Sequence, residues 1–168
     1  MEKNLATSQI ISKILIILFM IVTVIFGAGY MSKRWSSIRD IRRQADAQAI
    51  VKALDYYYLQ NGSYPAVVDD DSDGWDYSND TSQGGANFLS SLVSAGYLKA
   101  VPFDPKNDEV YYYRYKKFDA GEYGCAKPFY VFQVVRFEGD NVSHGNGSCP
   151  NLDWTKLAPN GYTALEQE

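Results

Sequence analysis

The sequence ILIILFMIVTVIFGAGYM occupies residues 14–31 and holds 18 consecutive positions without a charged side chain. As a helix with about 1.5 Å of rise per residue it would cover about 27 Å, close to the thickness of a bilayer's hydrocarbon core. Thr23 is its only polar residue before Tyr30, which disfavours a helix buried in a soluble core. We therefore predict a transmembrane helix at residues 14–31, preceded by a short N-terminal segment, residues 1–13.

A cleaved signal peptide is the main alternative for this segment. The small residues Gly27-Ala28-Gly29 resemble a cleavage site, although the apolar part of a signal peptide is usually shorter than this run. The uncleaved membrane helix is the favoured interpretation.

A second helical pattern follows the apolar run. In residues 33–60, apolar side chains recur at i, i+3, i+4, i+7, i+10 and i+11, which places them on one face of a helix. They are Ala47, Ile50, Val51, Leu54, Tyr57 and Tyr58. Residues 32–60 contain no glycine or proline, so this helix can continue directly from the membrane span. Asn61-Gly62 supplies a stop signal, and Pro65 prevents the helix from resuming.

The rest of the chain favours a small antiparallel sheet. The expected elements, in order, are a loop at 66–87, a short helix at 88–98, strands at 110–117 and 129–137, an irregular stretch at 138–161 and a third short strand at 161–165. A sheet packed on the apolar stripe would cover both apolar surfaces at once. The predicted fold class is therefore α+β, with a long N-terminal helix packed on a small antiparallel sheet in a soluble domain, residues 32–168.

Charge is unevenly distributed along the chain, whose formal net charge is −4. Residues 32–60 carry six basic and three acidic side chains, whereas residues 61–168 carry eight basic and sixteen acidic ones. An acidic outer domain disfavours nucleic acid as a partner, because binding requires Lys and Arg to neutralise phosphates. The basic stretch after the span either meets lipid headgroups or forms a solvated helix face, and the sequence leaves both open.

Two segments carry a resemblance to a known family. ALDYYYLQNGSYP (53–65) closes the amphipathic helix, and FLSSLVSAGYLKAVPFDPKNDEVYYYRY (88–115) follows it. Together they resemble the major pseudopilin of type II secretion systems and related type IV pilin-like proteins. The resemblance implies a pilin-like fold, with a helix half in the membrane and a C-terminal antiparallel sheet. It also implies subunits that polymerise by packing their N-terminal helices in a filament core.

The N-terminal segment departs from this family. Family members are processed after a Gly or Ala that precedes the apolar helix, and their fifth mature residue is commonly Glu. Here no acidic residue lies between Ile14 and Met31, and no Gly precedes the span. Cleavage by a prepilin peptidase is therefore not expected from this sequence, and an ordinary uncleaved anchor is the alternative.

The two cysteines, Cys125 and Cys149, are too far apart for a zinc site. In an extracytoplasmic domain they would form a disulfide, whereas two buried free thiols are the alternative. The basic residues that follow the span would by themselves place the C-terminal domain in the cytoplasm. The possible disulfide and the family resemblance indicate the opposite orientation, so we expect a single-pass membrane protein with its C-terminal domain outside the cytoplasm.

The sharpest local motif is DDDSDG, residues 69–74. Asp69, Asp71 and Asp73 fit D-x-D-x-D-G, the start of a calcium loop, in which alternate carboxylates wrap one hard cation. Asp80 stands at the twelfth position, where a bidentate Glu is usual. A calcium site formed by these four residues is therefore a hypothesis, and a solvated acidic loop is the alternative. No other cofactor is expected.

No constellation in the sequence indicates catalysis. The single histidine, His144, lies in a Gly/Asn/Ser stretch without a recognisable nucleophile or carboxylate motif beside it. We therefore expect a non-enzymatic structural subunit, without a small-molecule substrate, that assembles with other pilin-like subunits of a pilus, a pseudopilus-like filament or a secretion machine. A membrane-tethered binding domain that never polymerises is the alternative.

Overall fold

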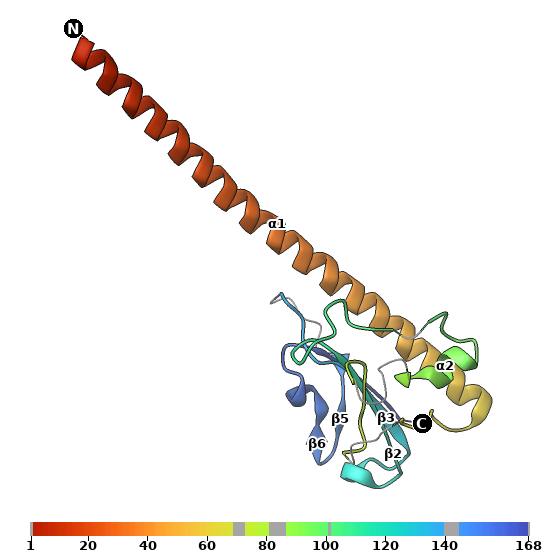
Figure 1. Cartoon of the computed structure of the whole chain (residues 1–168). Coiled ribbons are helices and arrows are strands. Elements are labelled where there is room, and N and C mark those ends of the chain that lie inside the picture. The colour runs from red at the N-terminus through yellow and green to blue at the C-terminus, as the bar shows by residue number, and fades with distance from the viewer. Residues whose placement is uncertain (1, 69–72, 81–86, 101, 140–144, 168) are drawn as a thin grey trace. The chain divides into compact units, whose positions relative to one another are not determined.

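The computed structural model describes residues 2–68, 73–80, 87–100, 102–139 and 145–167. The chain divides into two compact units, Met1–Ile38 and Arg39–Glu168, each of which is described by itself. Helix α1, Glu2–Asn61, supplies the described part of the first unit and is the first element of the second (Figure 1). All other helices and strands belong to the second unit.

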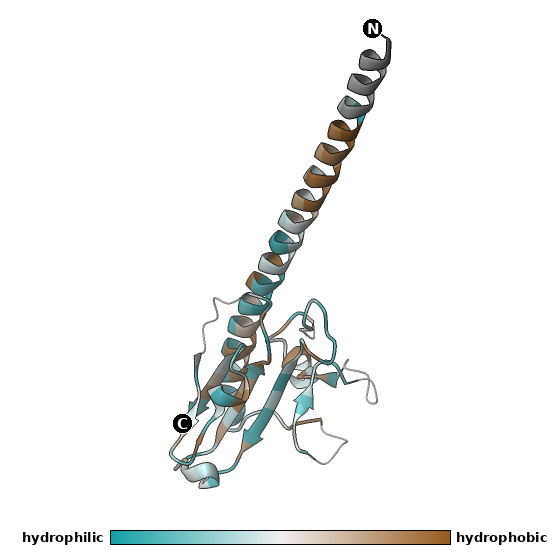
Figure 2. Ribbon diagram, turned by 90° about the vertical axis from the view of Figure 1, so that its left-hand side faces the viewer, coloured by the Kyte–Doolittle hydropathy of each residue, from teal (hydrophilic) through white to brown (hydrophobic). Residues whose placement is uncertain are grey.

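In the first unit, the large apolar side chains of residues 14–31 are exposed on the surface of α1. In Figure 2 the ribbon of this part of α1 is mostly brown, the colour of hydrophobic residues. The hydroxyl of Thr23, in the middle of this segment, donates to the carbonyl oxygen of Met20 at 2.8 Å, so it is satisfied inside the helix. The prediction that residues 14–31 are helical is confirmed.

In the second unit, α1 turns one face to the core. Ala47, Ile50 and Leu54 are almost completely buried, and Val51, Tyr57 and Tyr58 pack at the edge of the same cluster. The predicted stripe is thus the buried face of the helix. The helix ends where the sequence indicated, because Gly62 adopts a positive φ of 67° and its N–H donates to the carbonyl oxygen of Tyr58 at 2.7 Å.

The domain is built on a five-stranded sheet with the strand order β1-β2-β3-β7-β4. Neighbouring strands are antiparallel except β4 and β7, which are parallel. The strands are β1 (Asp76–Tyr77), β2 (Tyr113–Phe118), β3 (Phe129–Val134), β7 (Tyr162–Gln167) and β4 (Gly145–Asn146). The expected hairpin is β2 and β3, and the expected third strand is β7, so the α+β prediction is confirmed.

Each face of this sheet has its own core. Tyr113, Tyr115, Tyr130 and Phe132 alternate along β2 and β3 and are buried with the stripe of α1. The intervening side chains include Phe118, Phe129 and Val131, which belong to a second cluster with Trp154 and the two cysteines. The sheet is therefore covered by the helix on one face and by a smaller layer on the other.

This smaller layer was not predicted from the sequence. Within the stretch expected to be irregular lie strands β4, β5 (Ser148–Cys149) and β6 (Leu152–Asp153), and the 3-10 helix η3 (Trp154–Leu157). Strand β1 likewise lies inside the expected loop 66–87. These strands are two residues long, which is too short for an alternating pattern to be detected.

Three expected elements are shorter than predicted, among them strand β3, which ends at Val134 rather than at 137. Helix α2 covers only Ser90–Ser94, and Gly96, with a φ of 79°, lies just after it. Strand β2 begins at Tyr113 rather than at 110. The reason is a turn in which the carboxylate of Asp108 accepts the N–H groups of Val110 and Tyr111, at 2.9 and 2.8 Å.

Candidate functional site

The first candidate site is the apolar segment of α1. Its large side chains are about half to three-quarters exposed, from Val22 at 48% to Phe26 at 75%. Each such side chain gains about 1.5–3 kcal/mol when it is removed from water, so a continuous exposed run requires an apolar environment outside the chain. By length and composition, the described residues contain one helix able to cross a membrane, a property that it shares with signal sequences near an N-terminus.

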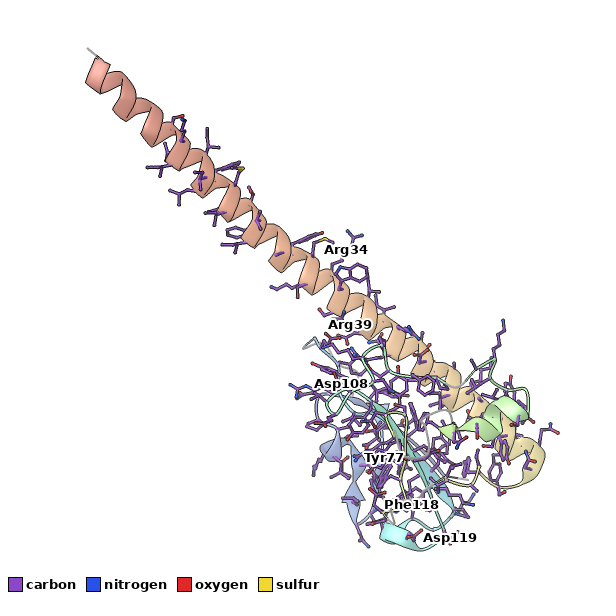
Figure 3. The ribbon with its side chains drawn as sticks, in the orientation of Figure 1. Arg34, Arg39, Tyr77, Asp108, Phe118 and Asp119 are labelled. Atoms are coloured by element: carbon purple, nitrogen blue, oxygen red, sulfur yellow. A yellow bond between two sulfur atoms is a disulfide. The ribbon has the colours of Figure 1, made fainter. Side chains whose placement is uncertain are left out.

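The end of this segment has the composition of a membrane–water boundary. Tyr30 and Trp35 are 68% and 56% exposed. The cations Lys33 and Arg34 lie between them in the sequence and are also exposed (Figure 3 labels Arg34). Aromatic rings and basic side chains are typical of the level of the lipid headgroups. If the helix spans a membrane, residues 30–35 mark one edge of the hydrocarbon.

A second candidate is a group of charged residues near the start of the domain, here called the arginine cluster. Its centre is Arg43, which is completely buried on the sheet side of α1. The guanidinium forms two bonds with Asp104, at 2.6 and 2.9 Å, and single bonds with Asp40 at 2.7 Å and Glu138 at 2.9 Å. Burial lowers the pKa of Arg43, but the bonds with these carboxylates outweigh it and raise the pKa above its ordinary value.

Glu138 joins the other two cations to this cluster. Arg39, which lies on the side of α1 facing the domain (Figure 3), forms two bonds with it at 2.6 Å, and Lys106 approaches it at 3.1 Å. The bond with Arg39 is the main reason that the pKa of Glu138 is lowered to about 2, with Arg43 and Lys106 adding to it against the effect of burial. The cluster comprises Arg39, Asp40, Arg43, Asp104, Lys106 and Glu138. It fastens the segments around 104 and 138 to the helix.

Sequence reasoning missed this cluster, although one signal for it was present. Arg43 lies four residues before Ala47 and seven before Ile50, which places it on the apolar stripe. A cation at such a position needs a buried anion, because an unpaired buried charge is very costly. By themselves, Arg39 and Arg43 read only as two of the basic residues that follow the membrane span.

The predicted calcium motif is only partly within the described residues. Asp69 and Asp71 lie outside them. The carboxylate of Asp73 accepts the N–H of Trp75 at 2.7 Å and the hydroxyl of Tyr77 at 2.5 Å, and the backbone N–H of Asp80 donates to Tyr77. Among the described residues, no group of three or more His, Cys, Asp or Glu side chains is placed to hold a metal ion. Calcium binding therefore stays a prediction.

If the motif binds calcium, the full chain in detergent should release or absorb heat when titrated with millimolar calcium. Replacing Asp71 and Asp73 by Asn should abolish this heat, because two of the four proposed carboxylate ligands lose their charge. Asp119→Asn is the matched control, since Asp119 is an exposed carboxylate outside the motif (Figure 3). Absence of binding by the unmodified chain at millimolar calcium would contradict the hypothesis.

The two cysteines form a disulfide, which confirms the expected pairing over free thiols. Cys125 and Cys149 are 24 residues apart in sequence, and their Cα atoms are 5.2 Å apart. The bridge joins the segment after the 3-10 helix η2 (Glu122–Gly124) to β5 and is buried in the second cluster beside Trp154. A disulfide is typical of an oxidising compartment, which supports an extracytoplasmic location for the domain.

His144 lies outside the described residues.

These features define a class of architecture. A long N-terminal helix carries an exposed apolar segment, and its later part packs on an antiparallel sheet, which is the architecture of pilin-like proteins. No protein family, no curated protein and no solved structure matches the chain.

Proposed function

We propose that this chain is a non-enzymatic structural subunit of a pilus, a pseudopilus-like filament or a secretion machine. In this proposal the apolar segment of α1 first anchors the subunit in the membrane and then packs against the same segment of other pilin-like subunits. The disulfide-bonded domain is held outside the cytoplasm. The resemblance of residues 53–65 and 88–115 to the pseudopilin family supports this assignment.

One observation carries the proposal. The 18-residue apolar window of α1 has no buried residue, whereas the stripe beginning at Ala47 is buried in the domain. The domain therefore completes its own core without using the first half of the helix. That half is available for contacts outside the chain, as an assembly helix must be.

The second candidate function is a membrane-tethered binding domain that does not polymerise. It is favoured by the absence of an acidic side chain between Ile14 and Met31, since the related family commonly uses such a residue against the amine of a neighbouring subunit. In that case the apolar segment contacts lipid only.

Photo-cross-linking in producing cells separates the two functions. A photoreactive residue at Val22, in the middle of the apolar segment, should produce dimers and higher oligomers in the membrane fraction if the helices pack together. The matched control is the same residue at Lys127, an exposed position of the domain far from Val22 in sequence. Monomers alone at Val22 would favour the tether, and a soluble chain shortened to the region of Gly27–Gly29 would favour a signal peptide.

A further inference from the structure

The basic residues that follow the apolar segment differ in whether the chain supplies an anion for them. Arg39, Arg42 and Arg43 each form an ion pair with at least one carboxylate. None of the ion pairs among the described residues includes Lys33 or Arg34, and both side chains are exposed. Figure 3 shows Arg34 projecting from the surface of α1. Lys33 and Arg34 are therefore available to an anion outside the chain.

The helix itself offers these two cations no carboxylate. Ion pairs along a helix form between residues three or four positions apart. The residues at those distances from Lys33 and Arg34 are all uncharged: Gly29, Tyr30, Met31, Ser36, Ser37 and Ile38. The first acidic residue beyond the apolar segment is Asp40, which is already bonded to Arg43 at 2.7 Å. A lasting counter-ion for Lys33 and Arg34 has to come from another molecule.

The place of these cations along α1 matches the depth of lipid phosphates. Lys13 and Lys33 are the charged residues that flank the apolar segment, and they are 20 positions apart in the sequence. In a helix this separation is about 30 Å, the thickness of a bilayer's hydrocarbon core. The exposed rings of Tyr30 and Trp35 are of the kind found at the same level. With the apolar segment in a bilayer, the side chains of Lys33 and Arg34 reach the headgroups.

We propose that Lys33 and Arg34 bind the phosphates of anionic phospholipids, so that acidic lipids such as phosphatidylglycerol are enriched around this end of the helix. Charge complementarity favours an acidic lipid, because a zwitterionic lipid carries its own cation beside the phosphate. Each cation near a membrane surface favours anionic lipid by about fivefold. This binding rests on the membrane anchorage in the proposed function and holds whether or not the chain polymerises.

Quenching of Trp35 by brominated phospholipids measures which lipids surround this end of the helix. The full-length chain is reconstituted, highly diluted in lipid, into vesicles of phosphatidylcholine with a minor fraction of phosphatidylglycerol. Bromine near the headgroup end of the acyl chains is carried either by the phosphatidylglycerol or by an equal fraction of the phosphatidylcholine. Trp75 and Trp154 lie in the domain, and a Trp35→Phe chain supplies their signal for subtraction. Comparison of the two quenched signals gives the preference for anionic lipid.

We expect the parent chain to prefer phosphatidylglycerol at least fivefold. Lys33→Gln combined with Arg34→Gln should reduce this preference to about one, because glutamine keeps a polar side chain that suits a helix but carries no charge. Arg42→Gln is the matched control and should retain the preference, since the exposed cation that it removes has Asp46 beside it at 3.7 Å.

Three results would count against the proposal, and they differ in what else they affect. Equal quenching by the two brominated lipids in the parent chain would overturn the lipid preference and leave the membrane anchorage intact. A preference that the double variant retains would also overturn it, because groups other than Lys33 and Arg34 would then select the lipid. If vesicles in which every lipid is brominated do not quench Trp35, the membrane anchorage of the proposed function is itself contradicted.

Discussion

Arg43→Met is expected to lower the free energy of unfolding of the domain by about 3–5 kcal/mol. The side chains of Arg43 and Asp104 are both completely buried, so the variant leaves the Asp104 carboxylate without its cation in a place that water does not reach. The loss is a large part of the stability of an ordinary domain, which is about 5–15 kcal/mol. Thermal unfolding of the full chain in detergent should show a decrease in Tm of about 10–20 °C.

Two further variants identify the cause of this loss. Arg42→Ala is the matched control, because the neighbouring side chain of Arg42 is 62% exposed and its nitrogen lies 3.7 Å from Asp46. We expect that change to stay within about 0.5 kcal/mol of the parent. Arg43→Met combined with Asp104→Asn removes the stranded charge and should recover at least half of the loss. If Arg43→Met alone lowers the free energy of unfolding by less than about 1 kcal/mol, that result would contradict a buried Asp104 carboxylate without its cation.

Removal of the disulfide is expected to have the second largest effect. Cys125 and Cys149 close a loop across 24 residues, and in the chain-entropy account such a link destabilises the unfolded state by about 3 kcal/mol. Replacing both cysteines by Ser should therefore lower the free energy of unfolding by about this amount, with a further loss from the two hydroxyls placed in an apolar cluster. The measurement is urea unfolding without reductant.

Reduction provides the control for this variant. The parent chain with reductant should unfold at nearly the same urea concentration as the double-serine variant, whereas the variant itself should not respond to reductant. If reductant leaves the parent unchanged at denaturant concentrations that unfold the variant, the serines and not the missing bond are responsible.

The sequence predicted those parts of the fold that repeat over many residues. The apolar segment at 14–31 and the stripe from Ala47 to Tyr58 each extend over several helical turns, and the strands β2, β3 and β7 are each six residues long. Patterns of this length are resolved from a single chain because each additional residue agrees with the same period. The end of the helix at Gly62 was also predictable from the sequence, since the end of a helix often requires a positive φ, which glycine adopts readily.

The parts that sequence reasoning missed depend on contacts between distant residues. Arg39 and Glu138 are 99 positions apart, and Arg43 meets Asp104 across 61. Nothing local distinguishes these charged residues from solvated ones, apart from the position of Arg43 on the apolar stripe. The calcium hypothesis had a local motif, but Asp69 and Asp71 are outside the described residues, so the structure does not test it.

The order of the strands has a consequence for the biogenesis of this protein. Strand β7 comes last of the five along the chain, yet it lies between β3 and β4 within the sheet. The apolar segment at 14–31 leaves the ribosome more than a hundred residues before β7 does, and β3 lacks one neighbour until β7 has been made. During this interval the backbone of β3 has an unpaired edge. The edge of β3 is therefore covered only once residues 162–167 have been added to the chain.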